Sequence, residues 1–137
     1  MTEKEQSECK ATAVALKGIS FFGLIVFITI PTVLMVSKHY LLLENSLILL
    51  FVICGLFLGF RAWHLRFDAK LLEEVANKSF DLNDLDSVIF KLFGKKMGNK
   101  SLQERIISCQ KLAKEFLLLL KIHLGFYVLL MVFLLFF

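Results

Sequence analysis

Long uncharged stretches alternate with charged ones along this chain of 137 residues. Residues 18–37 hold no charged side chain, and at about 1.5 Å per helical residue they span roughly 30 Å, the thickness of a bilayer hydrocarbon core. Residues 41–60 match that length with one acid near their start, and residues 115–137 close the chain with another apolar run. The pattern therefore predicts three transmembrane helices at these positions.

The order of the three spans predicts their topology. Only residues 38–40 separate the first two spans, and so short a connection favours two antiparallel neighbours, a helical hairpin. Residues 61–114 hold eleven of the sixteen Lys and Arg, and loops rich in these residues lie in the cytoplasm. We therefore expect the N-terminal segment 1–17 to be cytoplasmic as well. The predicted fold class is an all-α membrane protein: a hairpin plus a C-terminal span, with a cytoplasmic helical segment between spans two and three.

The basic segment 61–114 carries helix signals of its own. No breaker follows the second span, so its helix should continue to about Asn77. Apolar residues at helical spacing predict a short helix over 82–93. Ser101 and Glu104 have the spacing of a capping box, from which a helix should run unbroken into the third span. Its inward face is expected at the following positions: Leu102, Ile106, Cys109, Ala113, Phe116 and Leu120.

Small residues and one proline mark special places in the first two spans. Gly55 and Gly59 have small-xxx-small spacing, which lets another helix approach closely, either from the same chain or from a second copy. Pro31 lacks a backbone N–H and predicts a kink in the first span. The hydroxyls of Thr29 and Thr32 are candidates to bond the carbonyl that proline leaves unpaired.

Composition narrows the possible function. Apolar residues make up 58% of the chain, more than so small a domain can bury, so the excess must face lipid or a protein partner. No basic stripe with interleaved aromatics predicts nucleic-acid binding. An odd count of three cysteines, Cys9, Cys54 and Cys109, predicts reduced thiols. No spacing of metal ligands or catalytic groups appears, so we expect no metal, no cofactor and no enzymatic activity.

Arg61, His64 and Asp68 form the candidate polar cluster. At 100° per residue they fall on one face of the helical extension beyond the second span. One hypothesis is a proton-sensing or substrate-anchoring site in which Asp68 orients a titrating His64. The other is a hydrogen-bonded patch that fixes helix packing at the membrane boundary.

A second candidate site consists of Lys95, Lys96 and Lys100, which lie in a short stretch between two predicted helices. Lysines this close to a bilayer attract anionic lipid headgroups. A solvated turn explains them equally well. Membrane lipids are thus expected partners, together with a protein partner or further copies of the chain.

Three functional hypotheses remain. The first is a small non-catalytic subunit of a membrane complex, which binds partners through its spans and its cytoplasmic helices. The second is a homo-oligomeric pore, against which Lys121 and His123 stand as isolated polar groups that form no channel-lining stripe. The third is a small membrane enzyme or transporter centred on Arg61, His64 and Asp68. A short chain without a cleavable leader is typical of the bacterial inner membrane, with its N-terminus in the cytoplasm.

Overall fold

The computed structural model describes residues 2–36, 42–77 and 101–136. Within them the chain is almost entirely helical and forms α1 (Glu3–Phe21), α2 (Gly23–Val36), α3 (Leu42–Ala76) and α5 (Leu102–Phe136). Three helical stretches are long and apolar enough to cross a membrane: α1 together with α2, α3, and α5. This confirms the all-helical class and the presence of three helices that are long and apolar enough to span a membrane. The helix expected over 82–93 and the connection at 38–40 lie outside the described residues.

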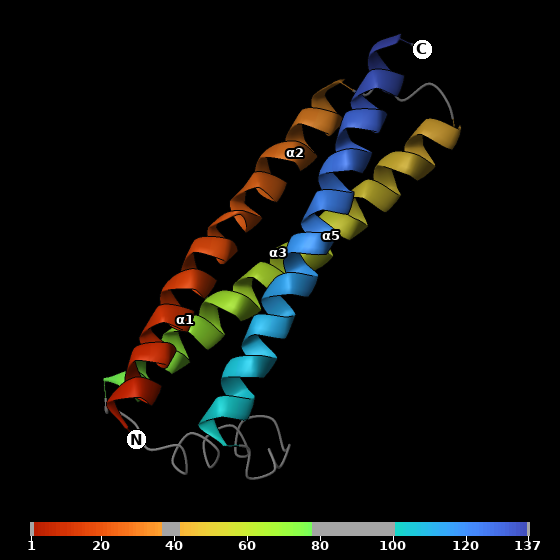
Figure 1. The fold of residues 1–137 in the computed structure, drawn as a ribbon. Helices are drawn as coiled ribbons and strands as arrows, with labels where there is room; N and C mark the ends of the chain where they lie inside the picture. Colours follow the sequence, from red (N-terminus) through yellow and green to blue (C-terminus); the bar gives the residue numbers. More distant parts are fainter. Residues whose placement is uncertain (1, 37–41, 78–100, 137) are drawn as a thin grey trace, which may run out of the picture.

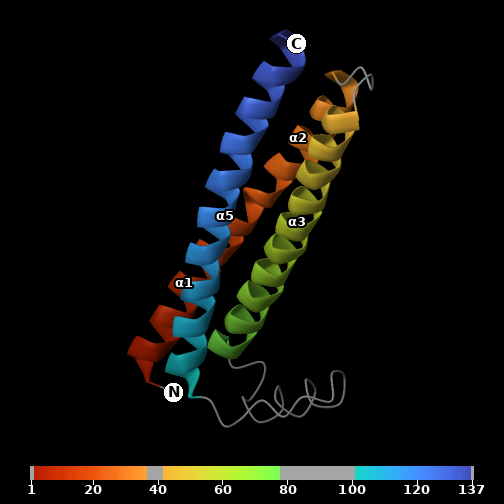
Figure 2. The same ribbon diagram turned by 90° about the vertical axis from the view of Figure 1, so that its right-hand side faces the viewer.

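The helices form an elongated three-membered bundle. Helix α3 runs antiparallel to the other two members, and the N- and C-termini lie at opposite ends (Figures 1 and 2). The antiparallel order is visible in single contacts. The Gln6 side-chain amide donates to the carbonyl of Ala76 at 2.7 Å, so the start of α1 lies beside the end of α3. Near the middle of the bundle, Ile30 of α2 lies against Gly55 of α3.

The first membrane helix is interrupted at Phe22, where α1 ends and α2 begins. The Phe22 backbone N–H donates to the carbonyl of Ile19 at 3.1 Å, as in a tightened last helical turn. Pro31, by contrast, lies inside α2. The break in the helix therefore occurs ahead of the position where the proline predicts a kink.

The threonines near Pro31 do bond backbone carbonyls, but not the expected one. Thr29 donates to the carbonyl of Val26 at 3.0 Å, and Thr32 donates to the carbonyl of Thr29 at 2.8 Å. The carbonyl that Pro31 leaves unpaired belongs to Phe27, four residues earlier. The hydroxyls stay with the preceding turn because a threonine in a helix reaches the carbonyl three residues back.

Two helix predictions for the basic segment are confirmed. Helix α3 continues to Ala76, and α5 begins after Ser101 and runs to Phe136. The capping box is formed: the Ser101 N–H donates to Glu104 Oε2 at 2.8 Å, and the Glu104 N–H donates to Ser101 Oγ at 3.3 Å. At 35 residues each, α3 and α5 are roughly 53 Å long, well beyond a hydrocarbon core of about 30 Å.

The antiparallel order gathers charge at one end of the bundle. Residues 3–17 of α1, 61–76 of α3 and 102–115 of α5 contain most of the charged side chains of the described residues. These three stretches pack together at the end where the N-terminus lies (Figure 1). We call this region the charged end. It continues the membrane bundle rather than forming a separate domain.

The interior consists of two clusters of buried side chains. The larger extends from the charged end to the middle of the bundle and contains, among others, Leu16, Leu65 and Phe116. The smaller lies toward the C-terminus and centres on Phe51. The predicted inward face of α5 is confirmed: Ile106, Ala113, Phe116 and Leu120 are buried, and Leu102 and Cys109 are half-buried.

Candidate functional site

In the predicted cluster of Arg61, His64 and Asp68, the first two side chains contact aromatic rings of α3. The Arg61 guanidinium lies 5.1 Å from the ring centroid of Phe57, a cation–π contact one turn back along α3. The exposed His64 ring packs edge-on against Phe60, with ring centroids 4.6 Å apart. Within the described part of the chain, no hydrogen bond or ion pair joins the three side chains.

Asp68 faces inward, toward α5. It lies beyond the apolar run that ends at residue 60, and burial raises the pKa of its carboxyl, while the positive charge of His64 opposes this shift. Burial also raises the pKa of the Cys109 thiol to about 11, with a further contribution from the Asp68 charge. Cys109 is therefore a protonated thiol at neutral pH rather than a nucleophile.

The two glycines of the small-xxx-small spacing have different surroundings. A Cβ atom at Gly55 would lie 2.7 Å from Ile30 Cδ1, so α2 packs directly on this position. A Cβ atom at Gly59 would meet only the ring of Phe27, at 3.6 Å, which is ordinary contact. A third glycine, Gly23, is the most crowded of those in the described ranges, because a Cβ there would overlap the Cβ of Ala62.

A buried polar layer crosses the membrane part of the bundle. The His123 side chain of α5 is only 3% exposed, and its Nε2 lies 3.3 Å from Thr29 Oγ1 of α2. Its ring stacks on Phe51 of α3, with centroids 4.3 Å apart and an interplanar angle of 16°. One turn further along, Thr32 Oγ1 and the Tyr127 hydroxyl lie 3.2 Å apart. The sequence predicts that His123 is isolated. In the structure, His123 of α5 contacts both α2 and α3 and so joins all three members of the bundle.

The hydrogen bonds of Thr29 indicate which nitrogen of the His123 ring donates to it. Thr29 uses its single hydroxyl proton on the carbonyl of Val26, so its oxygen accepts from His123 Nε2–H. The remaining ring nitrogen, Nδ1, is then an acceptor, and it has no partner within the described residues. The hydrogen bond from Nε2 and the stack on Phe51 fix the orientation of the ring between the helices.

The sequence contained a signal for this layer. Thr29 and Thr32 are three residues apart on α2, and His123 and Tyr127 are four apart on α5. Each pair therefore lies on one face of its helix. Two polar pairs in separate spans, each on one face of its helix, indicate an interhelical contact.

The Thr29–His123 contact predicts a measurable coupling. In a double-mutant cycle of Thr29→Val and His123→Phe, we expect a coupling energy of about 1 kcal/mol, near the upper part of the range for hydrogen bonds between membrane helices. Phenylalanine keeps the stack on Phe51 and valine keeps the volume of threonine. The free energy of unfolding in mixed detergent micelles is the readout. Strictly additive single effects would contradict the hydrogen bond.

The remaining predictions concern a lysine cluster, metal ligands and the cysteines. Lys95, Lys96 and Lys100 lie outside the described residues. Over the three described ranges, no three side chains of His, Cys, Asp or Glu are grouped as a metal site would need. Cys9, Cys54 and Cys109 are free thiols.

The comparisons with known proteins give no further direction. The chain matches no family model, no curated protein and no solved structure. Its function must therefore be inferred from its own residues.

Proposed function

We propose that this protein is a non-catalytic subunit of a membrane complex, which binds a protein partner through the outer face of α3. In this proposal the charged end and the N-terminus lie in the cytoplasm, and the membrane is a bacterial inner membrane. The excess of Lys and Arg in residues 61–114 supports that orientation.

The observation that carries the proposal is a row of aromatic rings on α3. We call Phe60, Trp63, His64 and Phe67 the aromatic stripe. Neighbouring rings contact one another, with centroids 4.6 to 6.3 Å apart. Yet Phe60, Trp63 and Phe67 are 57%, 63% and 46% exposed. The stripe is therefore ordered by its own contacts and still presents a large apolar surface.

The position of the stripe favours a protein rather than lipid as its main neighbour. It begins at the end of the apolar run 41–60 and extends about 10 Å further along the helix. Trp63 suits the membrane interface, but Phe67 lies one turn further along α3, at the depth of the charged side chains Arg66 and Lys70, where acyl chains do not cover an apolar ring. Protein interfaces are enriched in aromatic residues and arginine, and Arg61 lies at the edge of the stripe.

Other helices of the charged end also carry exposed apolar side chains. Val14 of α1 and Ile107 of α5 are exposed apolar side chains outside the predicted spans. The packing of His64 against Phe60 makes the His64 ring part of the aromatic stripe and so supports a role in binding. Neither the pore nor the enzyme hypothesis has a comparable supporting contact.

Truncation of the stripe tests the proposal. Trp63→Ala with Phe67→Ala should weaken the complex more than tenfold, since central aromatic residues often contribute about 2 kcal/mol or more to an interface. The control, Val128→Ala with Leu129→Ala, removes exposed apolar groups from the membrane part of α5 and should leave the complex intact. The readout is the mass of the complex purified in mild detergent. A lone chain, a conducting homo-oligomer, or a complex that tolerates the stripe variant would overturn the proposal.

A further inference from the structure

A groove of about 460 Å³ lies between the first membrane helix and α3. It runs past the break at Phe22, where α1 gives way to α2. Its floor is made of residues with little or no side chain, Gly23, Gly59 and Ala62. These small residues keep the surface hollow, because larger side chains at the same positions would fill it.

One end of the groove is cationic. Lys17 of α1 and Arg66 and Lys70 of α3 line it, and no acidic side chain does. Lys17 is paired with Glu73, just beyond the groove, whereas Arg66 and Lys70 have no ion-pair partner among the described residues. Three positive charges against one negative charge leave this end with a formal net charge of +2.

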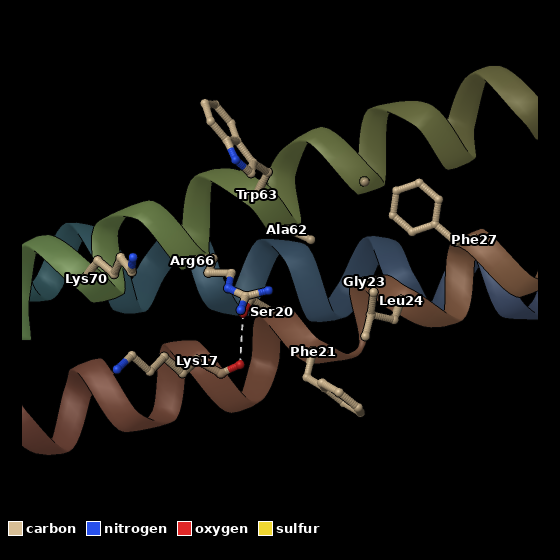
Figure 3. Close-up of a pocket in the computed structure, with 11 residues that line it drawn as sticks. Lys17, Ser20, Phe21, Gly23, Leu24, Phe27, Ala62, Trp63, Arg66 and Lys70 are labelled. Atoms are coloured by element: carbon tan, nitrogen blue, oxygen red, sulfur yellow. Dashed lines mark hydrogen bonds between the residues drawn. The ribbon is translucent and has the colours of Figure 1, made fainter.

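The other end is apolar and exposed. Phe21, Leu24 and Phe27 line it, and all three belong to the exposed large apolar residues of the chain. Figure 3 shows the order along the groove: Lys17 and Lys70 at one end, Arg66 next, and Leu24 and Phe27 at the other. The distance along the helix from Lys17 to Phe27 is about 15 Å.

The groove therefore crosses the boundary between water and hydrocarbon. Lys17 is the last charged residue before the uncharged run of the first span, and Arg66 and Lys70 follow the run of the second. The cations thus lie at headgroup depth and the apolar end lies at acyl-chain depth. This order of charge, then apolar surface, matches an anionic amphiphile whose head is at the interface.

We propose that the groove binds an anionic phospholipid. Its phosphate lies between Arg66 and Lys70, with Lys17 beside them. The first part of one acyl chain follows Leu24 and Phe27 across Gly59. This gives Gly59 a role beyond helix packing, because a Cβ atom there would meet only the ring of Phe27, at an ordinary contact distance of 3.6 Å. The inference does not depend on the proposed protein partner.

Trp63, the only tryptophan of the chain, lines the groove and provides the probe. The full-length protein is placed in phosphatidylcholine bilayers that contain a small fraction of brominated lipid, which quenches nearby tryptophan fluorescence. Brominated phosphatidylglycerol should quench Trp63 with about a tenfold higher apparent affinity than brominated phosphatidylcholine. This follows from cations that each contribute a severalfold preference near an anionic surface. Equal quenching by the two lipids would overturn the proposal.

Matched variants locate the site. Arg66→Gln with Lys70→Gln should abolish the preference for phosphatidylglycerol. Lys10→Gln with Lys111→Gln removes the same charge from exposed positions outside the groove and should preserve it. An equal loss of the preference for phosphatidylglycerol in both double variants would show that general surface charge causes the preference. That result would contradict a specific site in the groove.

Two further measurements test whether the groove binds the whole lipid or only its phosphate group. Gly59→Leu should fill the groove and reduce the preference at least severalfold, while circular dichroism reports an unchanged helix content. Soluble glycerol phosphate at millimolar concentration should not displace the brominated lipid. If it does so efficiently, the site binds free phosphate groups, and the proposed acyl-chain contact is wrong.

Discussion

Gly23→Leu is expected to lower the free energy of unfolding by about 3 kcal/mol, in the upper part of the range for overpacked interiors. A Cβ atom at this position overlaps the Cβ of Ala62, and the Cα of Ala62 is only 3.8 Å away. Both atoms belong to or adjoin the backbone of α3, so no rotamer change relieves the overlap. The two helices must separate, and the groove floor would be lost with them.

The matched control for Gly23 is Gly18, which lies in the same membrane helix but where an added Cβ would meet no atom within 4 Å. Gly18→Leu should be neutral or stabilise by up to about 1 kcal/mol, because glycine is a poor helix former. Unfolding is followed by titrating the detergent-solubilised protein with sodium dodecyl sulfate. Equal effects at the two glycines would show that α2 and α3 are not in close contact.

Phe51→Ala is the second substitution with a large expected effect, a loss of about 3 kcal/mol. The Phe51 side chain is 0% exposed and lies in the smaller buried cluster, where it stacks on His123 and meets Phe126 edge-on at 5.8 Å. Truncation leaves a cavity and removes the surface on which His123 rests. Lipid replaces water as the outer solvent, so lost packing rather than hydration dominates the cost.

Phe57 of the same helix provides the comparison for Phe51. Its ring is about half exposed and contacts the Arg61 guanidinium. Phe57→Ala should cost less than about 1 kcal/mol, since an exposed cation–π contact contributes roughly 0.5–1 kcal/mol. The same detergent titration measures both variants. A cost at Phe57 as large as that at Phe51 would contradict the assignment of inner and outer faces of α3.

The helices were predictable because their signals are local. The capping box at Ser101 and Glu104 predicts the start of α5, and the absence of breakers predicts the continuation of α3 to Ala76. Pro31 shows the limit of such signals. Pro31 lies inside α2, whereas the interruption of the first membrane helix falls at Phe22, which the sequence-based prediction did not single out.

The candidate sites were less predictable because they combine residues from different helices. Arg61, His64 and Asp68 share one helix, so the sequence could group them, but the side chains of Arg61 and His64 contact aromatic rings one turn back along α3 rather than each other. Arg66 and Lys70 have the pattern of a solvated face. Only the approach of α1 brings Lys17 beside them and turns that face into one wall of a groove.

By itself the sequence determined that three stretches of this chain suit a membrane, how far α3 extends and where α5 begins. Those properties are sums over neighbouring residues, and they do not depend on how the helices rotate. The tertiary structure alone decided that Thr29 meets His123 and that Gly23 meets Ala62. Such pairs depend on the register and rotation of whole helices, and a shift of a single residue turns each side chain by about 100°.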